Sequence, residues 1–173
     1  MVYRLLMLSD ENDFFKRELQ IDSEATFLEL NDFILDSLGY ARDELTTFHL
    51  CDEEWQKELE ITMMDMGASS DEDSYLMADT RLEDLLDHKG QHLFFVFDML
   101  SERGFFIELA ELIPGKSLDK PVVTKAEGKA PKQLESIEVA ASRLATPATG
   151  EPWDDELFSD ESVDEGDIDL EGF

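Results

Sequence analysis

Two apolar runs separated by a short polar break lie between residues 92 and 112, where the sequence reads HLFFVFDMLSERGFFIELAEL. In the first run apolar side chains occupy both alternating faces, which is typical of a strand that is covered on both sides. In the second run one face is strongly apolar and the other is mixed, which predicts a strand nearer the sheet edge. Residues 101–104 form a loop of hairpin length, with Gly104 free to adopt a positive φ. The pattern predicts the central hairpin of a sheet.

Shorter apolar patterns predict four more strands. They lie at residues 2–9, 15–21, 47–51 and 57–62. The following stretch, residues 63–79, is polar and acidic and holds four of the seven methionines. Its glycine and serines make a regular element unfavourable, so we expect a connecting loop there.

Two segments have the form of a capping box, in which a hydroxyl and a carboxylate satisfy the free amides at a helix start. The first is Thr26-Phe27-Leu28-Glu29, followed by apolar residues at helical spacing and by Gly39 as the stop. The second is Thr80-Arg81-Leu82-Glu83, followed by a short apolar stripe and by Gly90 as the predicted end of the helix. The predicted fold is therefore α+β: an antiparallel-rich sheet of about six strands with two packed helices, in the order β-β-α-β-β-α-β-β.

The composition changes after Pro114, where lysines make residues 114–150 the only basic part of the chain. Prolines discourage long helices there, although residues 132–144 could form a short amphipathic helix against a supporting surface. Residues 151–173 hold eleven acidic side chains and no basic one, with apolar residues between them. We expect a folded domain over 1–113, a basic linker with room for a short helix over 114–150, and a flexible, disordered acidic tail over 151–173.

The charge of the chain limits the partners that it can have. Forty-three acidic and fourteen basic side chains give a formal net charge of -29, which repels nucleic-acid phosphates and anionic lipids. The expected partner is a protein with a basic surface, with no direct nucleic-acid or membrane binding. The single cysteine, Cys51, excludes an intramolecular disulfide, and the N-terminus does not resemble a signal peptide. No apolar run approaches the ~20 residues of a membrane span, so the cytoplasm is the expected location.

Arg17 and Asp98 are the candidate polar site of the folded part. Arg17 lies on the apolar side of its strand by periodicity, and Asp98 ends a strand that should be central. A buried guanidinium needs a carboxylate, so these two side chains could pair. The alternative is that both lie at the rim and meet solvent. We favour the alternative, because exposed ion pairs are common and weak.

Four side chains could in principle hold zinc: His49, Cys51, His88 and His92. Their spacing matches no recognised zinc motif, and His49 and Cys51 share one predicted strand, apart from the pair His88 and His92. A second thiol, a phosphate-binding loop and a nucleophile elbow are also missing from the sequence. We therefore assign no catalytic residue, cofactor or metal.

Several motifs resemble those of a known family. Phe15-Lys16-Arg17 matches an aromatic-Arg-Arg element with one conservative change, and Phe97-Asp98 matches an aromatic-Asp pair before a final strand. Over residues 2–113 the chain resembles the Ri-plasmid open-reading-frame-three-like family, also labelled insertion-element passenger proteins, and within it a divergent acidic-tailed branch from Bacteroides-like bacteria. The resemblance implies an α+β domain and no established reaction. The chain departs from the family pattern where Arg103 and Phe105 stand in place of a Trp and a His.

The favoured hypothesis is a non-enzymatic, cytoplasmic protein-interaction module. Aromatic anchors framed by negative charge give both steering and a modest affinity for a partly basic partner. The anchors in the tail are Trp153, Leu157, Phe158 and Phe173. In one variant of this hypothesis the acidic run mimics a nucleic-acid backbone and blocks a DNA-binding protein.

Two other hypotheses remain open. One is a small-ligand-binding protein or enzyme, with its site near Arg17, Asp98 and the loop at residues 63–79. The other is internal: the basic stretch at residues 116–132 pairs with the acidic tail and shields it, which would make compactness depend on salt.

Overall fold

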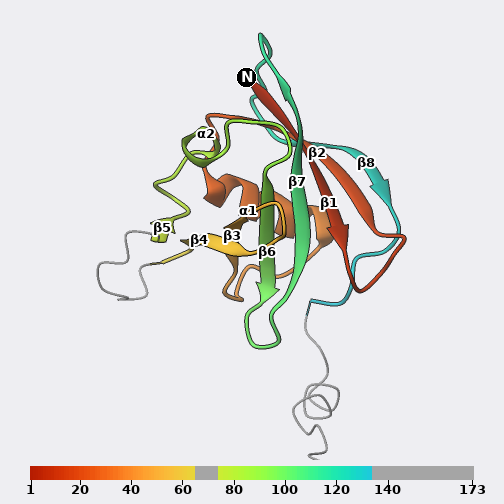
Figure 1. Ribbon diagram of the computed structural model, residues 1–173. Coiled ribbons are helices and arrows are strands. Elements are labelled where there is room, and N and C mark those ends of the chain that lie inside the picture. Colours follow the sequence, from red (N-terminus) through yellow and green to blue (C-terminus); the bar gives the residue numbers. More distant parts are fainter. Residues whose placement is uncertain (65–73, 134–173) are drawn as a thin grey trace, which may run out of the picture. The chain divides into compact units, whose positions relative to one another are not determined.

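A computed structural model describes residues 1–64 and 74–133 of the chain. The chain divides into two units, and these residues belong to the first, Met1–Leu134. Within them one sheet and two helices are formed (Figure 1). The strands are β1 (Val2–Ser9), β2 (Lys16–Asp22), β3 (Thr47–Cys51), β4 (Lys57–Thr62), β5 (Ser74–Leu76), β6 (His92–Asp98), β7 (Arg103–Ile113) and β8 (Val122–Glu127), and the helices are α1 (Phe27–Leu38) and α2 (Leu82–Leu85). Neither of these helices has the length and apolar character needed to cross a membrane.

The eight strands of the described residues follow the order β5-β4-β3-β6-β7-β1-β2-β8. All neighbours are antiparallel except β4 and β5, which are parallel. The predicted hairpin of β6 and β7 is central, as expected. Its second strand is not near the edge, however, because β1 pairs with β7 from Ser9 back to Val2. The α+β class is confirmed, whereas the predicted number of strands and order of elements along the chain differ from those observed.

The sequence analysis predicts about six strands, and it misses β5 and β8. β5 has three residues inside the predicted loop at 63–79. All six residues of β8 are exposed, so its sequence has no buried face from which a strand can be predicted. Main-chain pairing with β2 holds it in the sheet. The observed order is β-β-α-β-β-β-α-β-β-β, and the sheet continues beyond residue 113.

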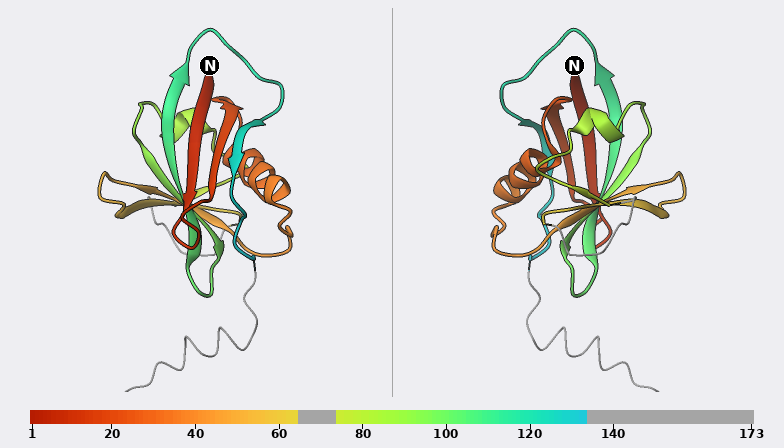
Figure 2. Two further views of the ribbon diagram at one scale, coloured as in Figure 1. Left: turned by 90° about the vertical axis from the view of Figure 1, so that its right-hand side faces the viewer. Right: turned by 90° about the vertical axis from the view of Figure 1, so that its left-hand side faces the viewer.

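Helix α1 packs on one face of the sheet (Figure 2) and begins and ends as predicted. At its start the Thr26 hydroxyl accepts from the Glu29 amide at 3.2 Å, and the Glu29 carboxylate accepts from the Thr26 amide at 2.8 Å. At its end Gly39 has a φ of 71°, which a residue without a Cβ adopts at little cost. The helix buries Phe27, Leu30, Ile34 and Leu35. Burial of each such side chain contributes about 1.5–3 kcal/mol to the stability of the fold. These side chains belong to the hydrophobic core between the helix and the sheet.

Two local predictions need correction. In the turn between β6 and β7 Glu102 adopts the positive φ, at 52°, and Gly104 already lies in β7. A Cβ at Gly104 would collide with the carbonyl oxygen of Phe95 on β6, so this glycine serves the close approach of two strands. Both ends of α2 differ from the prediction. Its cap lies one residue later, where the Asp84 carboxylate accepts from the Arg81 amide at 2.9 Å, and the helix ends at Leu85, before the predicted stop at Gly90.

Candidate functional site

Arg17 and Asp98 lie at the same end of the sheet but have different partners. Arg17 donates to the carbonyl oxygens of Glu127 at 2.6 Å and Gly128 at 3.1 Å. Asp98, whose side chain is 11% exposed, contacts Nη1 of Arg103 at 3.3 Å. Arg17 and Asp98 therefore do not pair with each other. The favoured interpretation, in which both meet solvent at the rim, is wrong for Asp98, which is largely buried against Arg103.

Arg103 is enclosed, with a side chain that is only 6% exposed. Its guanidinium meets the Glu11 carboxylate through Nε at 3.0 Å and Nη2 at 2.9 Å, in addition to Asp98. The same group donates to the carbonyl oxygens of Lys132 at 2.6 Å and Gln133 at 3.1 Å. Two carboxylates thus neutralise a buried guanidinium, which also holds two main-chain carbonyls.

Four aromatic rings pack between Arg17 and Arg103. The centroid distances are 5.0 Å for Phe15 to Phe105, 5.0 Å for Phe97 to Phe105 and 5.2 Å for Tyr40 to Phe97. Arg17 lies 4.4 Å over one outer ring, that of Phe15, and Arg103 lies 4.9 Å over the ring of Phe97. These cation–π contacts orient both guanidinium planes against a rigid aromatic platform.

Residues 127–133, which we call the strap, are bound through their main-chain carbonyls. Besides the two arginines, Asn12 Nδ2 donates to the Lys129 oxygen at 2.8 Å, and the Tyr40 hydroxyl donates to the Pro131 oxygen. Burial raises the pKa of Tyr40, which keeps this hydroxyl protonated as a donor. The side-chain donors form a set that we call the clamp: Asn12, Arg17, Tyr40 and Arg103. Because the clamp contacts carbonyl oxygens, it fixes the path of the strap beside the end of α1 (Figure 2).

A pocket with a volume of about 470 Å³ lies between the strap and the C-terminal end of α1. Its lining consists of Arg17, residues 37–40 and residues 128–133. Partial burial lowers the pKa of the Arg17 guanidinium. Arg17 thus contacts the strap and also lines the pocket.

The residues considered for zinc are partly brought together on the sheet face opposite α1. Cys51 in β3 pairs with His92 in β6, and His49 lies two residues away on the same face. The ring of His92 is stacked on Trp55 at 3.9 Å, while burial raises the pKa of the Cys51 thiol to about 11. A thiol that stays protonated is a poor ligand and nucleophile. His88 contacts Asp87 elsewhere, and the described residues contain no group of three potential ligands placed to hold a metal.

The described part of the predicted loop at residues 63–79 does not adjoin Arg17. The loop at residues 63–79 contains β5, which forms the opposite edge of the sheet from the β2–β8 edge. Its residues 65–73 lie outside the described part of the chain. The predicted tail anchors Trp153, Leu157, Phe158 and Phe173 also lie outside it.

Glu11, Tyr40 and Arg103 belong to the site but were not among the residues predicted from the sequence. For Arg103 a signal existed, because a hairpin that closes after Asp98 places the two side chains opposite each other. Glu11 meets Arg103 across 92 positions of sequence, and no local pattern marks such a contact.

Comparison with known proteins supports the family resemblance. A model of the family described as plasmid pRiA4b ORF-3-like protein matches residues 2–138, a range that includes β8 and the strap. A crystal structure of a protein of unknown function from Methanosarcina mazei is similar with a TM-score of 0.58 and 17% identity, covering 72% of this chain and 68% of that one. This likeness shows a shared fold. No curated protein matches the chain.

Proposed function

This chain belongs to the plasmid pRiA4b ORF-3-like family, and we propose that it works as a non-enzymatic protein-interaction module. The observation that carries the proposal is the clamp on the strap. Four side chains hold main-chain carbonyls of one segment, and contacts to main-chain carbonyls are a means of binding a peptide. The strap ends at Gln133, and the acidic residues of the C-terminal segment follow it in the sequence.

The chemistry of the described side chains supports binding over catalysis. A nucleophilic cysteine needs a lowered pKa, whereas burial raises that of Cys51. Asp98 and Glu11 are engaged by Arg103, so both carboxylates serve to hold a guanidinium. We therefore assign these charged groups to anchoring the strap.

The proposed partner is a protein with a basic surface, met in the cytoplasm. The net charge of -29 would speed its approach, and Trp153, Leu157, Phe158 and Phe173 would supply the apolar anchors. A DNA-binding protein whose basic groove accepts the acidic run is one partner of this class.

The test is affinity capture from a lysate of the source organism, with the full chain and a chain that ends at Gly150 as baits. The chain ending at Gly150 should keep its melting temperature and lose the partner. Binding of the purified partner should then weaken by about tenfold or more in Trp153→Ala/Phe158→Ala. The matched control Asp160→Asn/Glu161→Gln keeps the anchors and should mainly lower the association rate. Equal binding by the full and shortened chains would reject this function.

The pocket beside Arg17 favours a second candidate function, the binding of a small ligand. Its volume lies within the range of small-molecule sites. A ligand that binds only the folded state raises the melting temperature, so a screen of metabolites against the full chain tests this candidate. A screen without shifts would reject it.

A further inference from the structure

The pocket beside Arg17 differs from the rest of the molecule in the sign of its charge. The whole chain has 43 acidic and 14 basic residues, yet every charged residue described in this lining is basic. A second pocket, of about 330 Å³ at the other end of β2, has the opposite character. The charged lining residues are Arg17, Lys129 and Lys132 in the first pocket, and Asp22, Glu24, Glu29 and Asp119 in the second.

The guanidinium of Arg17 is fixed in place and retains donors. A guanidinium has five N–H groups. Within the described residues Nη1 donates to the carbonyl oxygens of Lys16 and Glu127, and Nη2 donates to that of Gly128. These three bonds leave Nε–H and one Nη2–H for a ligand. The guanidinium carbon also lies 4.4 Å from the centroid of the Phe15 ring, and this contact together with the three hydrogen bonds restricts the group.

Lys129 and Lys132 have flexible, charged side chains on a backbone that hydrogen bonds hold in place. Their carbonyl oxygens accept from Asn12 and Arg103, at 2.8 Å and 2.6 Å. Both residues are exposed, so their ammonium groups are hydrated and can turn toward a ligand. The backbone of the strap thus places two cations beside the oriented guanidinium.

Two effects oppose an anion here, and both are limited. The C-terminal end of α1 carries partial negative charge, but the amides of Gly39 and Tyr40 already donate to the last carbonyls, those of Asp36 and Leu35. The negative charge of the whole chain is screened beyond about 8 Å at physiological ionic strength. At contact distance the three lining cations therefore dominate.

We propose that this pocket is a binding site for an anionic group, a carboxylate or a phosphate, with Arg17 as the fixed donor and Lys129 and Lys132 as adaptable cations. The inference deepens the second candidate function and does not depend on the interaction module. The anion could be free in solution or belong to the acidic residues 151–173 of the chain itself, and the experiment separates these two sources.

The experiment is a titration of the full chain with inorganic phosphate and with citrate, at constant ionic strength, followed by melting temperature. The key variant is Lys129→Gln/Lys132→Gln, which removes both ammonium groups and keeps the carbonyls that the clamp holds. The matched control is Lys120→Gln/Lys125→Gln, which removes the same charge from residues that precede the strap and do not line the pocket. We expect a saturable rise in melting temperature for wild type and control, and about tenfold weaker binding by the key variant.

The proposal would be overturned if the wild-type chain showed no saturable response, or if binding weakened equally in the control. Stabilisation by neutral ligands alone would also overturn it, because that result would support a ligand-binding pocket but reject an anion site. A synthetic peptide of residues 151–173 is then added during the phosphate titration. Competition by the peptide assigns the site to the chain's own carboxylates, and the absence of competition assigns it to a free anion. Both results support the site.

Discussion

The two arginines of the clamp bind the same strap in different electrostatic surroundings. Arg103 is 6% exposed and contacts the carboxylates of Glu11 and Asp98. Arg17 is half-buried, and its hydrogen bonds within the described residues go to neutral carbonyl oxygens. A buried guanidinium whose charge is neutralised by carboxylates contributes to the stability of the fold. A guanidinium that contacts only neutral oxygens retains a net positive charge that can attract an anionic ligand. The comparison indicates that the Arg103 half of the clamp is structural and the Arg17 half is available for binding.

The largest expected effect is that of Arg103→Met. This substitution leaves Glu11 and Asp98 without their guanidinium in a largely buried position, and loss of one partner of a buried pair costs about 3–5 kcal/mol. Urea unfolding monitored by circular dichroism should show this loss in the free energy of unfolding.

Arg42 provides the matched control for that experiment. Its side chain is 52% exposed and pairs with Asp32 and Asp36 at the surface. Arg42→Met should change the free energy of unfolding by less than about 1 kcal/mol. If both substitutions cost the same, Arg103 is an ordinary surface arginine and the structural half of the comparison is wrong.

A smaller loss is expected for Arg17→Met. The carbonyls of Glu127 and Gly128 lie at exposed positions and can be hydrated when the guanidinium is removed. We expect a cost of about 1–2 kcal/mol in the same urea experiment, together with loss of the response to phosphate. A cost as large as that of Arg103→Met would show that the two halves of the clamp are equivalent.

Tyr40→Phe should cost about 1 kcal/mol at neutral pH, because one hydrogen bond to the strap is lost. Burial raises the folded-state pKa of Tyr40, so its contribution is fully present below the unfolded pKa of about 10 and falls as the pH rises above that value. Urea unfolding at several alkaline pH values should show wild type losing stability more steeply than Tyr40→Phe. Parallel curves would mean that the Tyr40 hydroxyl is not buried against the strap.

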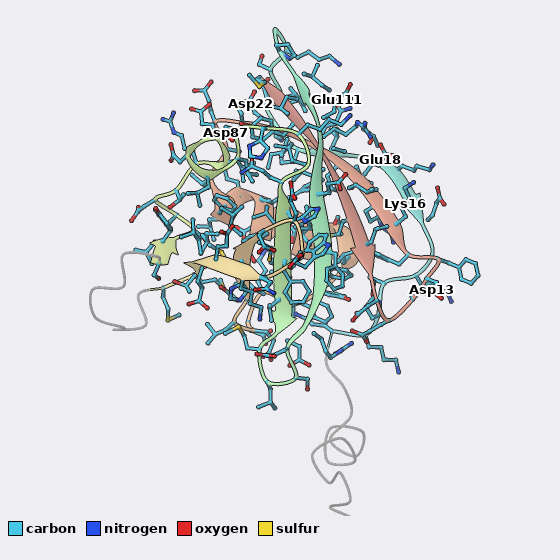
Figure 3. All side chains as sticks on the ribbon, in the orientation of Figure 1. Asp13, Lys16, Glu18, Asp22, Asp87 and Glu111 are labelled. Atoms are coloured by element: carbon cyan, nitrogen blue, oxygen red, sulfur yellow. The ribbon has the colours of Figure 1, made fainter. Side chains whose placement is uncertain are left out.

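The smallest effect is expected at the acidic end of β2. The amides of Glu24 and Leu118 hold the pKa of Asp22 below its usual value, through contacts of 3.0 Å and 3.1 Å. Figure 3 places Asp22 and Glu18 along this strand. Asp22→Asn should cost about 0.5–1 kcal/mol above pH 5, and the difference should vanish as the pH falls through the lowered pKa. A difference that persists in strong acid would contradict this role.

The sequence predicted the fold where local rules decide it. The capping box at Thr26 and the stop at Gly39 depend on neighbouring residues and were correct. β8 was missed because it has no buried face. The prediction that β7 lies near the edge failed for a physical reason: an interior strand with one face turned away from the helix has the same mixed pattern as an edge strand.

The sequence indicates the contacts of the candidate site less well than the fold. Periodicity raises Arg17 and Asp98 as a possible pair and favours two solvent-exposed side chains, whereas Asp98 contacts Arg103 and Arg17 contacts the strap. Whether Asp98 pairs with Arg17 or Arg103 depends on the register of the β6–β7 hairpin. It also depends on contacts of Arg103 with Glu11 and the strap, which are 92 and about 30 positions away in the sequence. Such long-range closure has no local signature, so the site became visible only in the structure.

The central claim is that the two arginines of the clamp have separate tasks. The most direct measurement is urea unfolding of wild type, Arg17→Met and Arg103→Lys, each with and without phosphate at constant ionic strength. Lysine keeps the charge of Arg103 but cannot form its fork of hydrogen bonds. We predict that Arg103→Lys is less stable and retains the stabilisation by phosphate, whereas Arg17→Met keeps more stability and loses that stabilisation. Equal losses of both quantities in the two variants would contradict the account.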